Sequence, residues 1–139
     1  MFQWSDAYLV NIPIIDQQHK KLFEIGNDIH KLIIESEKLE TYDEIEQEIE
    51  KLIDYTQFHF KHEERLLKEY NYVNYEGHVK EHEKFMDFLN AINIETIQHH
   101  QQEYVDVLLK FVAQWIFKHM MHADFNYSDL LITGMEFDK

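Results

Sequence analysis

Four stretches of this 139-residue chain repeat apolar side chains in alternating steps of three and four residues. That spacing keeps the apolar side chains on one face of an α-helix, whereas a half-buried strand alternates every two residues. The pattern constrains the fold strongly, because each helix must bury its apolar stripe against another element. It predicts helices over roughly 16–37, 42–69, 77–93 and 103–123.

Few residues are available for tight turns, since the chain contains one proline and three glycines. This scarcity disfavours a sandwich or barrel and favours long helices with short connections. Four such helices predict an all-α fold, an antiparallel up-down-up-down four-helix bundle, in a single domain over 1–139. Residues 1–15 lack helical periodicity and predict an extended N-terminal arm, and residues 128–132 predict a short C-terminal turn.

Charge and composition exclude several classes of function. The chain carries 27 acidic side chains against 13 basic ones, a formal charge of −14, and such a surface repels the phosphates of nucleic acids. It has no cysteine, so thiolate zinc sites and Cys-ligated iron–sulfur clusters are excluded. No apolar run approaches roughly 18 residues and the first residues do not resemble a signal peptide, so we expect a cytoplasmic protein without a membrane partner.

Histidines occupy positions in the apolar stripes where leucine is usual. Of the ten histidines, five lie in those stripes, with at least one from each predicted helix: His19, His59, His78, His82 and His119. A lone histidine in such a position is usually a core residue that bonds a neighbouring carbonyl. Burying several without partners costs about 1–3 kcal/mol each, whereas a metal ion binds one ring nitrogen of each. The group therefore predicts a metal site.

Two pairs of these residues are spaced one helical turn apart. His59 and Glu63 are four residues apart, as are His78 and His82, which places each pair on one helix face. Imidazole and carboxylate ligands without sulfur suit iron, zinc, copper or manganese, and their number fits two metals with shared carboxylates better than one tetrahedral zinc. We interpret the following as surface or solvated residues: His30, His62, His99 and His100.

Several motifs follow one another in a characteristic order along the chain. They are Ile15-Asp16-Gln17-Gln18-His19 with Leu22-Phe23, His59-Phe60-Lys61-His62-Glu63-Glu64, His78-Val79-Lys80-Glu81-His82 and Trp115-Ile116-Phe117-Lys118-His119, followed by Asp124 and Tyr127. Together they cover nearly the whole chain. In this order they resemble the bacterial hemerythrin family, whose members are non-haem di-iron proteins that bind oxygen.

The resemblance implies two iron ions per chain with an oxo or hydroxo bridge. It implies that one iron is bound by His78, His82 and His119, that the other is bound by His19 and His59, and that both are bridged by Glu63 and Asp124. Asp124 follows His119 by five residues, about 140° around an ideal helix, so this assignment requires a π-bulge or a loosened turn. Helix periodicity alone would instead select His122, which lies three residues after His119.

The implied function is reversible dioxygen binding at the iron with an open position, for storage, transport or delivery, in a protein that is not an enzyme. Apolar side chains within a turn of the ligands are candidate walls of the oxygen pocket, although a bundle core would also contain them: Phe23, Phe60, Trp115, Ile116 and Met120. The alternatives are a di-iron enzyme acting on peroxide, nitric oxide or iron, and an oxygen sensor that signals through a separate partner. We expect a monomer, with an oxygen-consuming enzyme as a candidate partner.

Overall fold

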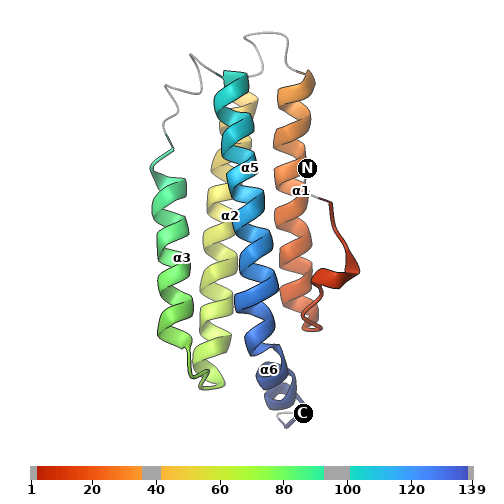
Figure 1. The fold of residues 1–139 in the computed structure, drawn as a ribbon, viewed down its shortest axis with the longest axis vertical. Helices are drawn as coiled ribbons and strands as arrows, with labels where there is room; N and C mark the ends of the chain where they lie inside the picture. The colour runs from red at the N-terminus through yellow and green to blue at the C-terminus, as the bar shows by residue number, and fades with distance from the viewer. Residues whose placement is uncertain (1–2, 36–41, 93–100, 138–139) are drawn as a thin grey trace.

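The computed structural model describes residues 3–35, 42–92 and 101–137, and these residues form helices and no strand. The elements in chain order are η1 Asp6–Tyr8, α1 Pro13–Glu35, α2 Tyr42–Glu69, α3 Tyr75–Asn90, α5 Gln101–His119, η3 Met120–Asp124 and α6 Phe125–Phe137. Figure 1 shows the four long helices side by side, with α1 and α3 running upward and α2 and α5 downward. The predicted all-α antiparallel four-helix bundle is confirmed.

The N-terminal arm lies along the outside of α1 (Figure 1). It turns at Asn11, whose φ of 63° lies in the left-handed region that asparagine tolerates better than most residues. The Val10 N–H donates a hydrogen bond to Asp16 Oδ1 over 2.8 Å, and Trp4 packs edge-on against Phe23 with ring centroids 5.4 Å apart. These contacts fix the arm against the first half of α1.

Some helix boundaries differ from the predicted ones. The first helix begins at Pro13 rather than at residue 16, because proline fits the first helical turn, where its missing N–H costs no hydrogen bond. α3 extends from Tyr75 to Asn90 instead of over 77–93, and α5 begins at Gln101 instead of residue 103. α2 has the predicted bounds, 42–69.

The short turn predicted at 128–132 is wrong, because this segment belongs to a thirteen-residue helix, α6. The chain continues from α5 through the π-helical segment η3 into α6 without leaving helical conformation. Tyr127 and Leu131 lie four residues apart in α6 and are both fully buried, in a cluster with Ile15 and Leu67. Burial of this second apolar stripe stabilises α6 as a helix.

The turn between α2 and α3 is closed by backbone hydrogen bonds. Asn71 has a φ of 56°, and the Tyr72 N–H donates to the Leu67 carbonyl over 2.9 Å, the pattern of a Schellman motif at a helix end. The motif reverses the chain within a few residues. α3 therefore packs directly against α2, with the start of α3 beside the end of α2.

The core consists of two apolar clusters. The larger cluster fills the bundle between α1, α2, α3 and α5 and includes Ile29, Leu52, Phe85 and Val112. The smaller cluster, at the end of the bundle near α6, consists of Val10, Ile12, Ile15, Leu67, Tyr127 and Leu131. The buried histidines lie between the two clusters, where each helix contributes a polar position to an otherwise apolar stripe.

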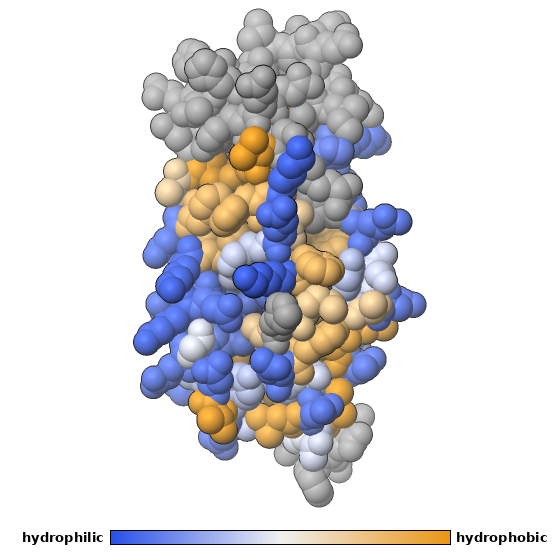
Figure 2. Space-filling view, in the orientation of Figure 1, coloured by the Kyte–Doolittle hydropathy of each residue, from blue (hydrophilic) through white to orange (hydrophobic). Residues whose placement is uncertain are grey.

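The surface is mixed. On the face seen in Figure 2, hydrophobic residues form separate patches between hydrophilic side chains. Among the described residues, no helix has the length and apolar character needed to cross a bilayer.

Candidate metal centre

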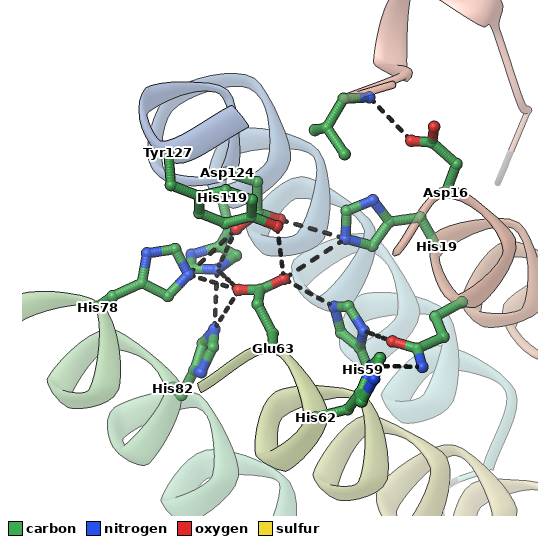
Figure 3. A network of polar contacts seen from close by, with 12 residues as sticks. Asp16, His19, His59, His62, Glu63, His78, His82, His119, Asp124 and Tyr127 are labelled. Carbon is green, nitrogen blue, oxygen red and sulfur yellow. Dashed lines mark hydrogen bonds and ion pairs between the residues drawn. The ribbon is translucent and has the colours of Figure 1, made fainter. Parts of the chain in front are cut away.

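Seven buried polar side chains meet between the two apolar clusters. They come from every long helix and from η3: His19, His59, Glu63, His78, His82, His119 and Asp124. Glu63 and Asp124 are 0% exposed, and the histidines are at most 5% exposed. The structure thus brings together all seven residues that the resemblance implied as ligands, and Figure 3 shows them facing one another.

Three histidines form a group on one side of the centre. His78 Nε2 lies 2.5 Å from Glu63 Oε1, and His82 Nε2 lies 3.2 Å from the same oxygen. His119 Nε2 lies 3.1 Å from Asp124 Oδ1 and 3.0 Å from His82 Nε2. With Glu63, these three histidines offer ligand atoms that all lie within 4.8 Å of one another.

Two histidines form a second group on the other side of Glu63 and Asp124 (Figure 3). His59 Nε2 lies 3.2 Å from Glu63 Oε2, and His19 Nε2 lies 3.2 Å from Asp124 Oδ2. These four residues also offer ligand atoms within 4.8 Å of one another.

Each carboxylate therefore faces both histidine groups. Glu63 presents Oε1 to His78 and His82 and Oε2 to His59. Asp124 presents Oδ1 to His119 and Oδ2 to His19. Two carboxylates that each offer one oxygen to each of two groups are the arrangement expected where two metal ions share bridging ligands.

The π-helical segment η3 is what brings Asp124 into the centre. In an ordinary α-helix, a residue five positions after His119 would lie about 140° away around the axis. A π-helix closes its turn with one more residue than an α-helix, so that the fifth residue returns to the face of the first. The π-bulge that the assignment of Asp124 required is confirmed at Met120–Asp124.

Without a metal, the carboxylates of the centre are held in their charged form. Burial alone would raise the pKa of Glu63, but the neighbouring imidazole rings of His119, His59, His78 and His82 hold it well below its usual range. Burial and the charge of Glu63 likewise oppose ionisation of Asp124, but His119 and His19 lower the pKa of Asp124. Both groups are therefore ready to act as anionic ligands near neutral pH.

Two histidines of the metal-free centre are protonated near neutral pH. Burial disfavours their charged forms, but the nearby charged carboxylates of Asp124 and Glu63 outweigh it. These carboxylates raise the pKa of His119 to about 10 and the pKa of His78 to about 9. Protons on these rings thus partly compensate the carboxylate charge that a metal ion would neutralise.

Several buried polar atoms of the centre lack a hydrogen-bond partner among the described residues. They are both ring nitrogens of His19, Nδ1 of His119 and both carboxylate oxygens of Asp124. His19 Nε2 and Asp124 Oδ2 are 3.2 Å apart but do not have the geometry of a hydrogen bond. Unpaired buried polar groups cost about 1–3 kcal/mol each, and a metal ion would bind the inward-facing ones. The donor set of imidazole and carboxylate is one that suits iron, so these residues fit a metal centre.

Two side chains outside the predicted ligand set contact the histidines from behind. Gln18 Oε1 lies 2.6 Å from His59 Nδ1, and Glu64 Oε2 lies 2.8 Å from His82 Nδ1. Sequence reasoning assigned them no role, although each is adjacent in sequence to a predicted ligand. Gln18 is 4% exposed, so its role becomes visible only once the packing of α1 on α2 is known.

A cavity of about 10 Å³ lies against His19 and His59. Its other lining residues are Leu22, Thr56, Phe60, Trp115, Ile116, His119, Met120 and Asp124. Four of the five predicted pocket residues are thus present. Phe23 is not, because its ring packs against Trp4 and Tyr8 of the arm, with ring centroids 5.4 and 5.8 Å away.

The remaining histidines lie outside the centre or outside the described residues. His62 is half-buried at the bundle edge, where its Nδ1 lies 3.0 Å from Gln18 Nε2. His99 and His100, and the side chain of His122, are outside the described residues; the backbone of His122 belongs to η3.

A four-helix bundle whose core holds five histidines and two shared carboxylates belongs to the class of non-haem metal-binding bundle proteins. Residues 10–131 match the family model described as the Hemerythrin HHE cation binding domain. The chain belongs to the hemerythrin family, as the motifs indicated.

Individual relatives agree with this assignment. The bacteriohemerythrin of Clostridium acetobutylicum is 36% identical over 129 residues, which cover 93% of this chain and 100% of that protein. The bacteriohemerythrin of Pseudomonas aeruginosa is 29% identical over 132 residues, covering 95% and 82% of the two chains. A crystal structure of wild-type hemerythrin has a TM-score of 0.78 and 25% identity, covering 93% of this chain and 96% of its own.

Proposed function

We propose that this protein binds dioxygen reversibly at a di-iron centre, for storage, transport or delivery. The observation that carries the proposal is that Glu63 and Asp124 each present one oxygen to each of two histidine groups of unequal size. In this proposal one iron is held by His78, His82 and His119 and the other by His19 and His59. Glu63 and Asp124 would be shared by the two ions, together with an oxo or hydroxo group.

The unequal groups suit binding at one of the two irons. Three histidines on one side and two on the other leave the two-histidine side with one ligand fewer. When bound, the iron pair supplies the electrons with which dioxygen is held. The cavity of about 10 Å³ adjoins His19 and His59, which form the group with fewer ligands.

The walls of this cavity disfavour proton delivery. Phe60, Ile116 and Met120 present apolar surface, which excludes water from the two-histidine side. Thr56 is the one hydroxyl-bearing residue among the described lining residues, and its Oγ1 donates to the Leu52 carbonyl over 2.7 Å. That proton is therefore not available to the cavity. A dry site with few proton donors favours reversible binding over reduction of the bound molecule.

The test is to load the protein with Fe(II) without air, admit oxygen, record the visible spectrum and measure iron per chain. We expect two irons per chain and a charge-transfer band that disappears when the sample is degassed. One metal per chain, or irreversible conversion to the oxidised form, would contradict the proposal. Steady consumption of peroxide or nitric oxide with a reductant would instead support an enzyme, which is the main alternative.

We further propose a monomeric, cytoplasmic protein that supplies oxygen to an oxygen-consuming enzyme and has no nucleic-acid or membrane partner. The formal charge of −14 supports this by keeping copies of the chain apart and by repelling phosphate-rich surfaces. Sedimentation equilibrium at physiological salt should give the mass of one chain, 17.1 kDa. A stable dimer, or a signalling partner recovered only with the oxygenated form, would favour the sensor alternative.

A further inference from the structure

In each histidine group, one ring is held from behind by a hydrogen bond to its outward-facing nitrogen. In the two-histidine group, His59 Nδ1 bonds Gln18 Oε1 over 2.6 Å, while Nδ1 of His19 has no hydrogen-bond partner among the described residues. In the three-histidine group, His82 Nδ1 bonds Glu64 Oε2 over 2.8 Å. Nδ1 of His119 in that group is 3.8 Å from Glu81, too far for a hydrogen bond.

The Gln18 amide fixes which ring nitrogen of His59 carries the proton. Its oxygen faces His59 Nδ1, so that Nδ1 must donate and Nε2 keeps a lone pair directed at the centre. Its nitrogen faces His62 Nδ1 over 3.0 Å, and an amide nitrogen only donates. The two contacts support each other. If the amide were reversed, its nitrogen would face His59 Nδ1, and the ring proton would have to lie on Nε2, which faces Glu63. With His62 Nδ1 as the acceptor, this contact keeps Gln18 in the orientation that leaves the Nε2 lone pair of His59 directed at the centre.

Glu64 does the same for His82 but adds a negative charge. A carboxylate accepts, so His82 Nδ1 donates to it and Nε2 keeps its lone pair for the centre. The Glu64 side chain is 14% exposed and lines an open pocket of about 170 Å³ together with Lys61 and Glu83. Glu64 therefore contacts both His82 and solvent.

We propose that Gln18 and Glu64 are positioning residues that make the two halves of the centre electronically unequal. A carboxylate behind a histidine raises the basicity of that ligand, and a neutral amide does so less. The half that contains His82 therefore donates more electron density than the half that contains His59. The inference rests on the proposed di-iron function and deepens it.

The inequality has a consequence for oxygen binding. The cavity adjoins His19 and His59, and so it lies on the half backed by the amide. Lower electron density there opposes spontaneous loss of electrons before dioxygen arrives. The neutral amide thus favours a centre that stays reduced, whereas a carboxylate at residue 18 would favour the oxidised form.

The test exchanges the two groups for their isosteres. Gln18→Glu should lower the reduction potential of the iron-loaded protein, and Glu64→Gln should raise it. Matched controls make the same charge changes nearby. Gln17→Glu is the control for Gln18→Glu, since Gln17 is the preceding residue on α1 and is exposed. Glu83→Gln is the control for Glu64→Gln, since Glu83 lines the same pocket as Glu64. Both controls should shift the potential less than the variants do. His62→Gln, combined with Gln18→Glu, prevents His62 from neutralising the new carboxylate.

Two further measurements separate this inference from the proposed function. In the Mössbauer spectrum of 57Fe-loaded protein, Gln18→Glu and Glu64→Gln should each perturb a different iron signal. In metal-free wild-type protein, nitrogen NMR should show the proton of His59 on Nδ1, and Gln18→Leu should abolish that preference. If the wild-type protein does not bind two irons, the proposed function is wrong. The NMR result still tests whether Gln18 sets the tautomer of His59.

Four results would overturn the inference. One is that both variants shift the potential in the same direction with two irons retained. Another is that both perturb the same iron signal. The third is a His59 tautomer that does not depend on Gln18. If Gln18→Glu does not retain iron, Gln18→Leu provides the test instead. It should bind iron about 10- to 100-fold more weakly than wild type. An iron affinity of Gln18→Leu equal to that of wild type would contradict the inference.

Discussion

Asp124 is the residue of the centre whose position depends most on an irregular backbone. Its two carboxylate oxygens face His19 and His119 from opposite histidine groups, over 3.2 and 3.1 Å. Its neighbour His122 fits the helical period after His119 better, and periodicity alone selects it. The two candidates can be separated by substitution.

Asp124→Ala should abolish binding of at least one of the two irons, because it removes an oxygen from each histidine group. His122→Ala should leave close to two irons per chain. The measurement is iron content by mass spectrometry after anaerobic loading and gel filtration. Equal losses in the two variants, or a larger loss in His122→Ala, would show that the Asp124 assignment is wrong.

Metal uptake should release protons. The pKa of His78 is about 9 and that of His119 about 10 in the metal-free chain, so both rings are protonated at pH 7. A metal ligand must be neutral imidazole, so loading should release about two protons per chain. Calorimetry in buffers of different ionisation enthalpy measures this number, and apparent affinity should rise with pH until about 9–10. A release near zero would contradict the charge state assigned to the metal-free centre.

The same pKa values predict how the metal-free chain responds to pH. Both histidines have folded-state pKa values above the ordinary histidine value of 6.5, so their ion pairs stabilise the fold fully below about pH 6.5. The stabilisation should fall as pH rises through 9 to 10. Urea midpoints of metal-free protein between pH 6 and 10 check this sign, and a midpoint that rises over the range would contradict it.

The five histidines and Glu63 that meet in the centre could be predicted from the sequence, but the side chains behind them could not. Histidine and glutamate in an apolar stripe are anomalous within a single helix, and so the sequence reveals them. The contacts of Gln18 with His59 and of Glu64 with His82 join different helices. They depend on how α1 packs on α2 and α2 on α3, which no local pattern specifies.

At the scale of the elements, the four long helices could be predicted from their apolar periodicity, whereas the π-helical segment η3 could not. A pattern that assumes one α-helical period cannot reveal a local change in that period. The resemblance to known motifs supplied Asp124, and the need for a π-bulge followed from its spacing. The burial of α6 was missed because Tyr127 and Leu131 continue the stripe only after the π segment shifts its phase.

Deleting one residue from η3 tests the role of the π segment. Removing Ala123, a half-buried residue, places the aspartate four positions after His119, which is the same face in an ordinary α-helix. Tyr127 and Leu131 keep their spacing to the aspartate. We expect this variant to retain two irons, whereas insertion of one alanine after Ala123 should lose them.

Iron content and helical circular dichroism of the two variants provide the measurement. Both should keep the four long helices, since the change lies after α5 ends at His119. Loss of iron from the deletion variant together with retention in the insertion variant would show that η3 places Asp124 in some other way.

At the scale of the whole molecule, the centre joins all four long helices and the start of the C-terminal extension. Metal bound there contacts elements that are far apart in the chain. Removing it leaves buried atoms of His19 and Asp124 without hydrogen-bond partners. The stability of the bundle should therefore depend strongly on the metal.

Chelation of the metal should lower the melting temperature markedly. Binding at a free metal concentration about 1,000 times Kd stabilises the fold by about 4 kcal/mol, which corresponds to roughly 10–15 °C for a domain of this size. Differential scanning calorimetry with and without a chelator measures the shift. In metal-free Asp124→Ala the chelator should have no effect, and an unchanged melting temperature in wild type would contradict the prediction.

Because Glu63 and Asp124 are shared between the two histidine groups, binding of a metal ion by one group is thermodynamically linked to binding by the other. An ion held by one group fixes carboxylates that the other group needs, and it partly neutralises their charge. A first ion would therefore change the affinity of the centre for a second, and the second would change that for the first by the same factor. If both groups bind an ion, occupancy of the two positions would be a single coupled equilibrium, whose cooperativity is set by these two side chains.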